Sequence, residues 1–212
     1  MFVFNHFNVD DHRISLLLPE RDQAHALFQV VEADRDELRK WMPWTDDTKS
    51  ERAEAKFIKY IQGRMVEGKV FMLTIAMDGV PVGMIDFHNI DHADRHAEVG
   101  YWLSSRVQGR GIMTRALKLM IDHGFKSMGL HKILIQVDSG NHKSDAIPKR
   151  LGFSKEAVFK EQIYFHGEYR DFVEFGLINH ANRDDSKIGK STLKSIPKLG
   201  VCNPLKYGTI SF

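Results

Sequence analysis

A short loop with two glycines, residues 108–114 (Gln-Gly-Arg-Gly-Ile-Met-Thr), could bind an anion. It follows a β-like segment and opens a helix-like one. Gly109 and Gly111 carry no Cβ atom, so a ligand can approach the backbone closely there. The N–H groups at the start of a helix have no acceptor inside the helix and favour a phosphate or pyrophosphate. Glycine pairs also make plain turns, so the surrounding elements must decide between the two interpretations.

Glu98, on the segment before the loop, is a candidate general base. In a strand it shares a face with Gly100 and Trp102. Enclosure among aromatic side chains would raise the pKa of its carboxyl group, which suits a group that accepts a proton. A solvated or salt-bridged glutamate is the alternative. Asp86 and His88, on the preceding segment, are rival bases, either directly or through water.

The order of the surrounding segments predicts an α/β (α+β) fold. Apolar β-like runs alternate with stripes of helical period along the chain. The expected strands are residues 13–18, 70–77, 80–88, 95–103, 132–137, 153–164 and 168–178, and the expected helices begin near residues 22, 34, 50, 113 and 141. Three strands in succession predict an antiparallel meander, whereas a helix between two strands predicts a parallel pair. The result is a mixed, mostly antiparallel central sheet with helices on both faces.

Two local patterns lie beside these elements. Trp41, Met42 and Trp44 are unusually apolar for a loop, and they form either a lid over the helical layer or one wall of a substrate cleft. Pro148 falls in the short helix that begins near residue 141. Proline is costly deep inside a helix, so we expect Pro148 to lie close to the start of this one.

The composition is that of an ordinary globular domain followed by a tail. Of the 212 residues, 42% are hydrophobic, and the net charge of +2 does not indicate a nucleic-acid or membrane partner. We expect residues 1–180 to form one domain and residues 181–212, rich in Ser, Lys, Gly and Pro, to form a flexible tail. Cys202 is the only cysteine, so an internal disulfide is impossible. Without a signal peptide, a ~20-residue apolar span or a metal-binding histidine spacing, a cytoplasmic protein without a metal is expected.

Several motifs together resemble one enzyme superfamily. The segment 98–103 (Glu-Val-Gly-Tyr-Trp-Leu), the glycine loop, the helix and strand that follow, and the Asn-x-x-Ser…Leu-Gly-Phe pattern from Asn141 resemble the GCN5-related N-acetyltransferase (GNAT) superfamily. Within it, the pattern is similar to the RimJ/RimL branch, which acetylates the α-amino group of ribosomal proteins. The resemblance spans about residues 13–178. Met113 stands where the superfamily's loop ends in Gly or Ala, a mild departure because that residue contributes chiefly its N–H.

The resemblance implies acetyl-CoA as cofactor and direct attack of an amine on the thioester, without an acyl-enzyme. The implied catalytic residues are Glu98 and Ser144. The implied cofactor-binding residues are Tyr101, Trp102, Leu103, Gln108, Gly109, Arg110, Gly111, Ile112, Met113, Thr114, Asn141 and Ser144. Ser144 would donate a proton to the departing thiolate, and it could also cap its helix, which is worth about 1 kcal/mol. The base proposed for this branch, a glutamate between the last two strands, is not clearly carried over: Ile163 occupies that place, and Glu161 lies two residues earlier.

Other functions stay open from the sequence. The acceptor could be the N-terminus of a protein, a polyamine or a drug amine, and the branch suggests a homodimer. A non-catalytic acetyl-CoA sensor would have the same fold. A dinucleotide-binding fold is the rival from another class, because Gly109, Gly111 and Asp138 partly imitate its fingerprint. Thr114 replaces the third glycine of that fingerprint, and the preceding strands form a meander, so this rival is the weaker one.

Overall fold

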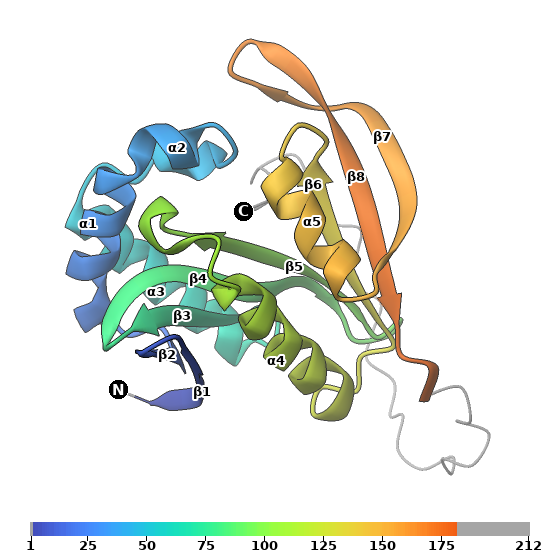
Figure 1. Ribbon diagram of the computed structural model, residues 1–212, viewed down its shortest axis with the longest axis horizontal. Helices are drawn as coiled ribbons and strands as arrows, with labels where there is room; N and C mark the ends of the chain where they lie inside the picture. Colours follow the sequence, from blue (N-terminus) through green and yellow to red (C-terminus); the bar gives the residue numbers. More distant parts are fainter. Residues whose placement is uncertain (1, 182–212) are drawn as a thin grey trace.

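The computed structural model describes residues 2–181, which form one eight-stranded sheet with helices on both faces (Figure 1). The strands are β1 (Val3–Val9), β2 (His12–Leu17), β3 (Phe71–Met77), β4 (Val80–Asp91), β5 (His96–Leu103), β6 (Lys132–Asp138), β7 (Ser154–Phe165) and β8 (Glu168–Ile178). Their order across the sheet is β1-β2-β3-β4-β5-β6-β8-β7. The expected tail, with Cys202, lies almost wholly outside the described residues.

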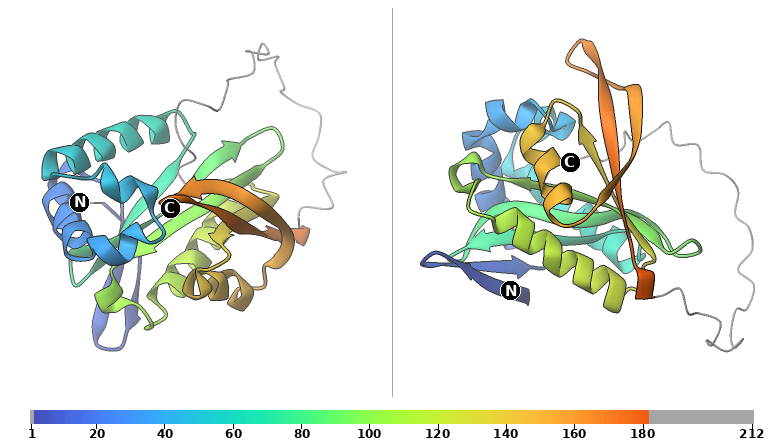
Figure 2. Two further views of the ribbon diagram at one scale, coloured as in Figure 1. Left: turned by 90° about the horizontal axis from the view of Figure 1, so that it is seen from above. Right: turned by 45° about the vertical axis from the view of Figure 1, so that its right-hand side comes forward.

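The helices divide between the two faces of the sheet (Figure 2). The helices are α1 (Ala24–Ala33), α2 (Arg35–Arg39), α3 (Glu51–Val66), α4 (Ile112–Lys126) and α5 (His142–Arg150). Each face of the sheet has its own cluster of buried apolar residues, and successive side chains of β5 point to opposite faces. Tyr101 packs with α4 in the larger cluster, and Trp102 packs with α1, α2 and α3 in the smaller one. The predicted fold class is therefore confirmed.

One strand pair gives the sheet its mixed character. All neighbouring strands are antiparallel except β5 and β6, which are parallel as predicted. This pair is short, because residues 96–98 pair with residues 132–134 and the pairing then ends. On its other side β5 stays paired with β4 as far as Leu103. The two central strands therefore part where β5 approaches the glycine loop.

The N-terminal strand β1 was not predicted. It pairs with β2 through a turn in which Asp10 has a φ of +52°. Asn and His interrupt its apolar residues, and the turn carries no glycine, so neither the period-2 pattern nor the usual turn signal is present.

Pro148 lies in the last turns of α5, and the expectation that it stands near the start of this helix is wrong. Proline has no N–H to donate to the carbonyl of residue i−4, which is Ser144. The Ser144 carbonyl instead accepts a hydrogen bond from the Tyr101 hydroxyl, at 3.3 Å. A partner from the sheet thus replaces the missing helical bond.

No helix within residues 2–181 is long and apolar enough to cross a lipid bilayer.

Candidate active site

The glycine loop between β5 and α4 presents a group of backbone N–H donors. Gly109 and Gly111 have φ values of +78° and +76°, which favour glycine, and a Cβ atom on either would meet nothing within 4 Å. The first bond of α4 runs from the Arg115 N–H to the Gly111 carbonyl. The N–H groups of residues 112–114 therefore have no acceptor inside the helix. The Gln108 side chain anchors the loop by donating to the Leu103 carbonyl at 2.9 Å.

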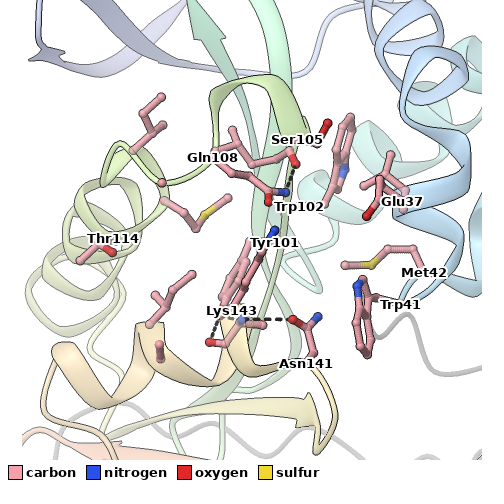
Figure 3. Close-up of a pocket in the computed structure, with 18 of the residues that line it drawn as sticks. Glu37, Trp41, Met42, Tyr101, Trp102, Ser105, Gln108, Thr114, Asn141 and Lys143 are labelled. Atoms are coloured by element: carbon pink, nitrogen blue, oxygen red, sulfur yellow. Dashed lines mark hydrogen bonds between the residues drawn. The ribbon is translucent and has the colours of Figure 1, made fainter.

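One cavity of about 510 Å³ connects this loop with both helical layers (Figure 3). It is lined by Asp34, Glu37, Leu38, Trp41, Met42, Tyr101, Trp102, Leu103, Ser105, Gln108, Gly109, Gly111, Ile112, Met113, Thr114, Asn141, Lys143, Ser144, Ala146, Ile147 and Arg150. All of the predicted cofactor-binding residues except Arg110 are among them. Of the two predicted catalytic residues, Ser144 lines the cavity and Glu98 does not. The structure thus brings together residues 101–114 and the start of α5, as the sequence suggested.

Ser144 faces the cavity at the start of α5. The cap of this helix is Asn141, whose side-chain oxygen accepts the Ser144 N–H at 3.1 Å. The suggested capping role of the Ser144 hydroxyl is therefore wrong. That hydroxyl lies 3.1 Å from the Tyr101 hydroxyl. Burial raises the pKa of Tyr101 to about 12, so the phenol keeps its proton at neutral pH.

The opposite end of the cavity is an aromatic wall that follows α2. Trp41 and Met42 line it, and Glu37 stands beside them (Figure 3). Trp44 does not line the cavity, but its ring lies 5.7 Å from that of Trp102. Trp41 and Met42 thus line a cavity, as the cleft-wall interpretation expects, and all three residues also pack with the helical layer, as the lid interpretation expects. The place of Glu37 on the cavity lining was not predicted from the sequence, because a single charged residue on a short helix forms no recognisable motif.

Asp34, between α1 and α2, was also missed. Its carboxylate accepts from the Ser104 hydroxyl at 2.6 Å, from the Ser105 N–H at 2.7 Å and from the Ser105 hydroxyl at 2.6 Å. Burial acts to raise the pKa of Asp34, but these three bonds outweigh it and the pKa lies below its ordinary value. Asp34 therefore stays charged and ties the helical wall to the segment that leads into the glycine loop.

Glu98 belongs to a buried charge cluster outside the cavity lining. His88 lies between two carboxylates, with Nδ1 2.8 Å from Asp86 Oδ1 and Nε2 3.5 Å from Glu98 Oε2. Burial alone would lower the pKa of His88, but both partners raise it to about 9. Burial has the opposite effect on a carboxyl group and would raise the pKa of Glu98. The hydrogen bond and the charge of His88 outweigh burial, so the pKa of Glu98 lies below its ordinary value. The expected raised pKa is thus wrong, because an imidazolium stands beside this carboxylate.

The β7–β8 hairpin reaches over to α2 at the aromatic wall (Figure 2). The His166 ring lies 3.0 Å from the Arg39 carbonyl oxygen, and the Arg170 guanidinium lies over the Trp41 ring at 5.9 Å. Glu161, the remaining candidate base, is an exposed residue in a bulge of β7 with a φ of +52°. It does not line the cavity.

Comparison with known proteins decides the family. The acetyltransferase (GNAT) domain family matches residues 13–154. The chain belongs to the GNAT acetyltransferase family. It is an acetyl-CoA-dependent N-acetyltransferase, as the motifs around the loop predicted. The amide-lined loop and the cavity that continues to Ser144 fit a GNAT donor site, because they offer phosphate-binding donors at one end and a side-chain hydroxyl further along.

Similar GNAT proteins differ in their acceptors. A putative ribosomal N-acetyltransferase, YdaF of Bacillus subtilis, is 29% identical over 171 residues, which is 80% of this chain and 93% of that protein. The spermidine N(1)-acetyltransferase of Escherichia coli K12 is 33% identical over 119 residues, covering 56% of this chain and 64% of that protein. Among solved structures, Mycobacterium smegmatis RimJ in complex with CoA-disulfide has a TM-score of 0.78 and 26% identity over 84% of this chain and 88% of that one. The family thus establishes the chemistry and leaves the acceptor to be inferred from the site.

Proposed function

We propose that this enzyme acetylates the N-terminal α-amine of a ribosomal protein. One observation carries the proposal: a single cavity joins the amides of the glycine loop to Ser144 and to the Trp41 wall. A donor and an acceptor can therefore meet beside Ser144 within one cavity. The ribosomal-type relatives support the acceptor class.

In this proposal the loop and β5 bind the donor. The N–H groups of residues 109–114 hold its pyrophosphate, and the backbone of β5 beyond the paired residues 96–98 holds its extended arm. Acetyl-CoA supplies the activated acetyl group when bound. Residues 101–103 lie where β5 has lost its β6 neighbour, so those of their backbone groups that are bonded neither to β4 nor to Gln108 would orient the thioester. Asn141 keeps the start of α5, and with it Ser144, in place.

Two side chains are proposed to move protons. Ser144 donates one to the leaving sulfur, and Glu98 accepts the amine's proton through water, since it does not reach the cavity itself. His88 is already protonated at neutral pH, with a pKa of about 9, so it is a poor base. The lowered pKa of Glu98 makes it a weak base that suits an amine with a low pKa. An α-amine has a pKa near ~8, whereas a side-chain amine such as that of lysine lies near ~10.4.

The charges along the cavity also favour an α-amine over a polyamine. Within residues 2–181, only Asp34 and Glu37 place carboxylates on its lining. Asp34 is occupied by Ser104 and Ser105, and Glu37 is paired with Lys40 at 2.6 Å. Lys143 adds positive charge to the lining. A polyamine carries several charges and would find few partners here, whereas a single amine beside apolar groups matches the wall of Trp41 and Met42.

A panel of acceptors tests the proposal. Peptides with free N-termini, the same peptides with blocked N-termini, and spermidine are each incubated with acetyl-CoA, and thiol release is measured. We expect turnover with the free peptides, none with the blocked ones, and little with spermidine. Faster turnover of spermidine would overturn the acceptor class. Binding of acetyl-CoA without transfer to any amine would instead favour the sensor interpretation.

We also propose that residues 1–180 form the catalytic domain, that residues 181–212 form a tail, and that the enzyme is a homodimer. A chain truncated after residue 180 should fold and keep full turnover if residues 181–212 are a tail. Loss of activity on truncation would overturn the domain boundary. The homodimer expected from the RimJ/RimL resemblance is measurable by light scattering.

A further inference from the structure

The polar atoms of Ser144 are held from three directions. Its N–H donates to Asn141 at 3.1 Å, which fixes the first turn of α5. Its carbonyl has no helical donor because residue i+4 is Pro148, and the Tyr101 hydroxyl donates to it at 3.3 Å. Its hydroxyl lies 3.1 Å from the same Tyr101 hydroxyl, which is the partner that the structure records for it within residues 2–181. One phenol from β5 thus serves two oxygens of one residue.

The Tyr101 side chain is held in place by burial. Its side chain belongs to the larger core cluster, and 8% of the residue is exposed. Arg150 and Asp145 are the charged groups that act on it electrostatically, and they do so with opposite sign. The phenol is therefore a rigid, neutral donor beside Ser144.

We propose that Tyr101 is a positioning residue for the Ser144 hydroxyl, an inference that rests on the proposed acid role of Ser144. The phenolic proton has two acceptors within reach, the carbonyl and the hydroxyl oxygen of Ser144. When it turns to the hydroxyl oxygen, the proton of Ser144 is free to point into the cavity. The Ser144 proton passes to the departing sulfur, and the hydrogen bond from Tyr101 stabilises the negative charge left on the serine oxygen. Ser144 then regains a proton from water, and the amine's proton is released to water through Glu98, so no proton is consumed overall.

A purely structural role for Tyr101 makes a different prediction. In that case the phenol would serve only to satisfy the carbonyl that Pro148 leaves without a helical donor. Replacing Pro148 with Ala supplies the missing N–H at residue 148. This N–H can donate a hydrogen bond to the Ser144 carbonyl. The two roles can therefore be separated by removing the phenol with and without this N–H.

The first measurement is steady-state kinetics of Tyr101→Phe. We expect kcat to fall about ten- to hundredfold, as for loss of a hydrogen bond to a charged group, with KM for acetyl-CoA within about threefold of the parent. Tyr169→Phe is the matched control, because this exposed tyrosine lies in the hairpin, with its ring 5.0 Å from that of Tyr164. It should leave both constants unchanged. Unchanged kcat in Tyr101→Phe would overturn the proposal.

The second measurement compares Tyr101→Phe/Pro148→Ala with Pro148→Ala alone. The loss of kcat should persist in this pair, since the backbone N–H cannot act on the Ser144 hydroxyl. Its disappearance would show that Tyr101 only satisfies the carbonyl, and would overturn the proposal. In Ser144→Ala, the added Tyr101→Phe change should cost little further, because both act on one oxygen. Full additivity would also overturn it, whereas a fully active Ser144→Ala enzyme would remove the acid role itself.

Discussion

Nη1 of Arg170, on β8, lies 2.8 Å from the carbonyl oxygen of Lys40, just after α2. The two residues are 130 positions apart, so this bond ties the C-terminal hairpin to the N-terminal helical layer. Arg170 also reaches Asp138 at the end of β6, at 3.1 Å. The same guanidinium lies over the ring of Trp41, a cavity wall residue. The Trp41 end of the cavity, where we propose that the acceptor binds, is thus shaped by three segments held by one side chain.

Replacing Arg170 with Ala should loosen the Trp41 wall. We expect kcat/KM for the acceptor to fall about three- to tenfold, while KM for acetyl-CoA stays near the parent value, because the glycine loop is untouched. The Lys160→Ala variant is the control, because the ion pair that it removes, with Asp171, joins two residues of the hairpin itself. Steady-state kinetics with each substrate varied in turn measures both constants. An equal loss for donor and acceptor would contradict this assignment.

Replacing Gly111 with Val should weaken acetyl-CoA binding at least tenfold. A side chain at φ +76° is strained by about 1–2 kcal/mol, and it would stand where we propose that the phosphates approach the amides. Gly129→Val is a matched control, since Gly129 also has a positive φ of +68° and open space around its Cβ, but lies in the turn after α4. Titration calorimetry should show weaker binding only for the Gly111 variant. Equal losses would mean that backbone strain alone is responsible.

The Ser144→Ala variant should lower kcat at least tenfold with a small change in KM for acetyl-CoA, since it removes the hydroxyl that we propose protonates the leaving sulfur, while Asn141 keeps capping α5. Asn141→Ala should instead lower the melting temperature, because the cap contributes about 1 kcal/mol. Kinetics and thermal unfolding of both variants separate the two effects. If Ser144→Ala kept the parent kcat, the hydroxyl would have no part in proton transfer.

The buried His88 should make stability depend on pH. Its pKa of about 9 in the folded protein lies above the ~6.5 of an unfolded chain, so folding takes up a proton between these values. The stabilisation is complete below about pH 6.5 and is lost as the pH rises through about 9, amounting to roughly 3 kcal/mol. Urea unfolding between pH 6 and 10 should record this decline. His88→Gln should lack it, and an equally steep decline in that variant would assign the effect elsewhere.

The elements around the donor site could be predicted from the sequence because local rules govern them. Residues 98–114 carry a strand period, two glycines and a helix start in direct succession, and each signal agrees with its neighbours. The opposite side of the cavity, around Trp41, could not be predicted in the same way. Arg170 meets Trp41, and Asp34 meets Ser105, only after the chain has folded. No local pattern encodes such distant pairs.

The electrostatics of Glu98 show the same limit. Its strand and its face were predictable from alternation, but the sign of its pKa shift was not. That sign depends on His88, which stands opposite Glu98 in the β4–β5 register, and on how far His88 is itself charged. Register between strands is a tertiary property, so a sequence argument based on enclosure alone gave the wrong direction.

The short pairing between β5 and β6 places the weakest strand pair of the sheet near its centre rather than at its edge. Beyond residues 98 and 134 these two strands face one another as a pair of inner edges. Amide protons of β5 that point away from β4 should therefore exchange with solvent faster than those of β3, although β5 is the more central strand. A ligand bound between these two strands would hold them together. The protection from amide exchange that it confers would therefore be greatest in the middle of the sheet.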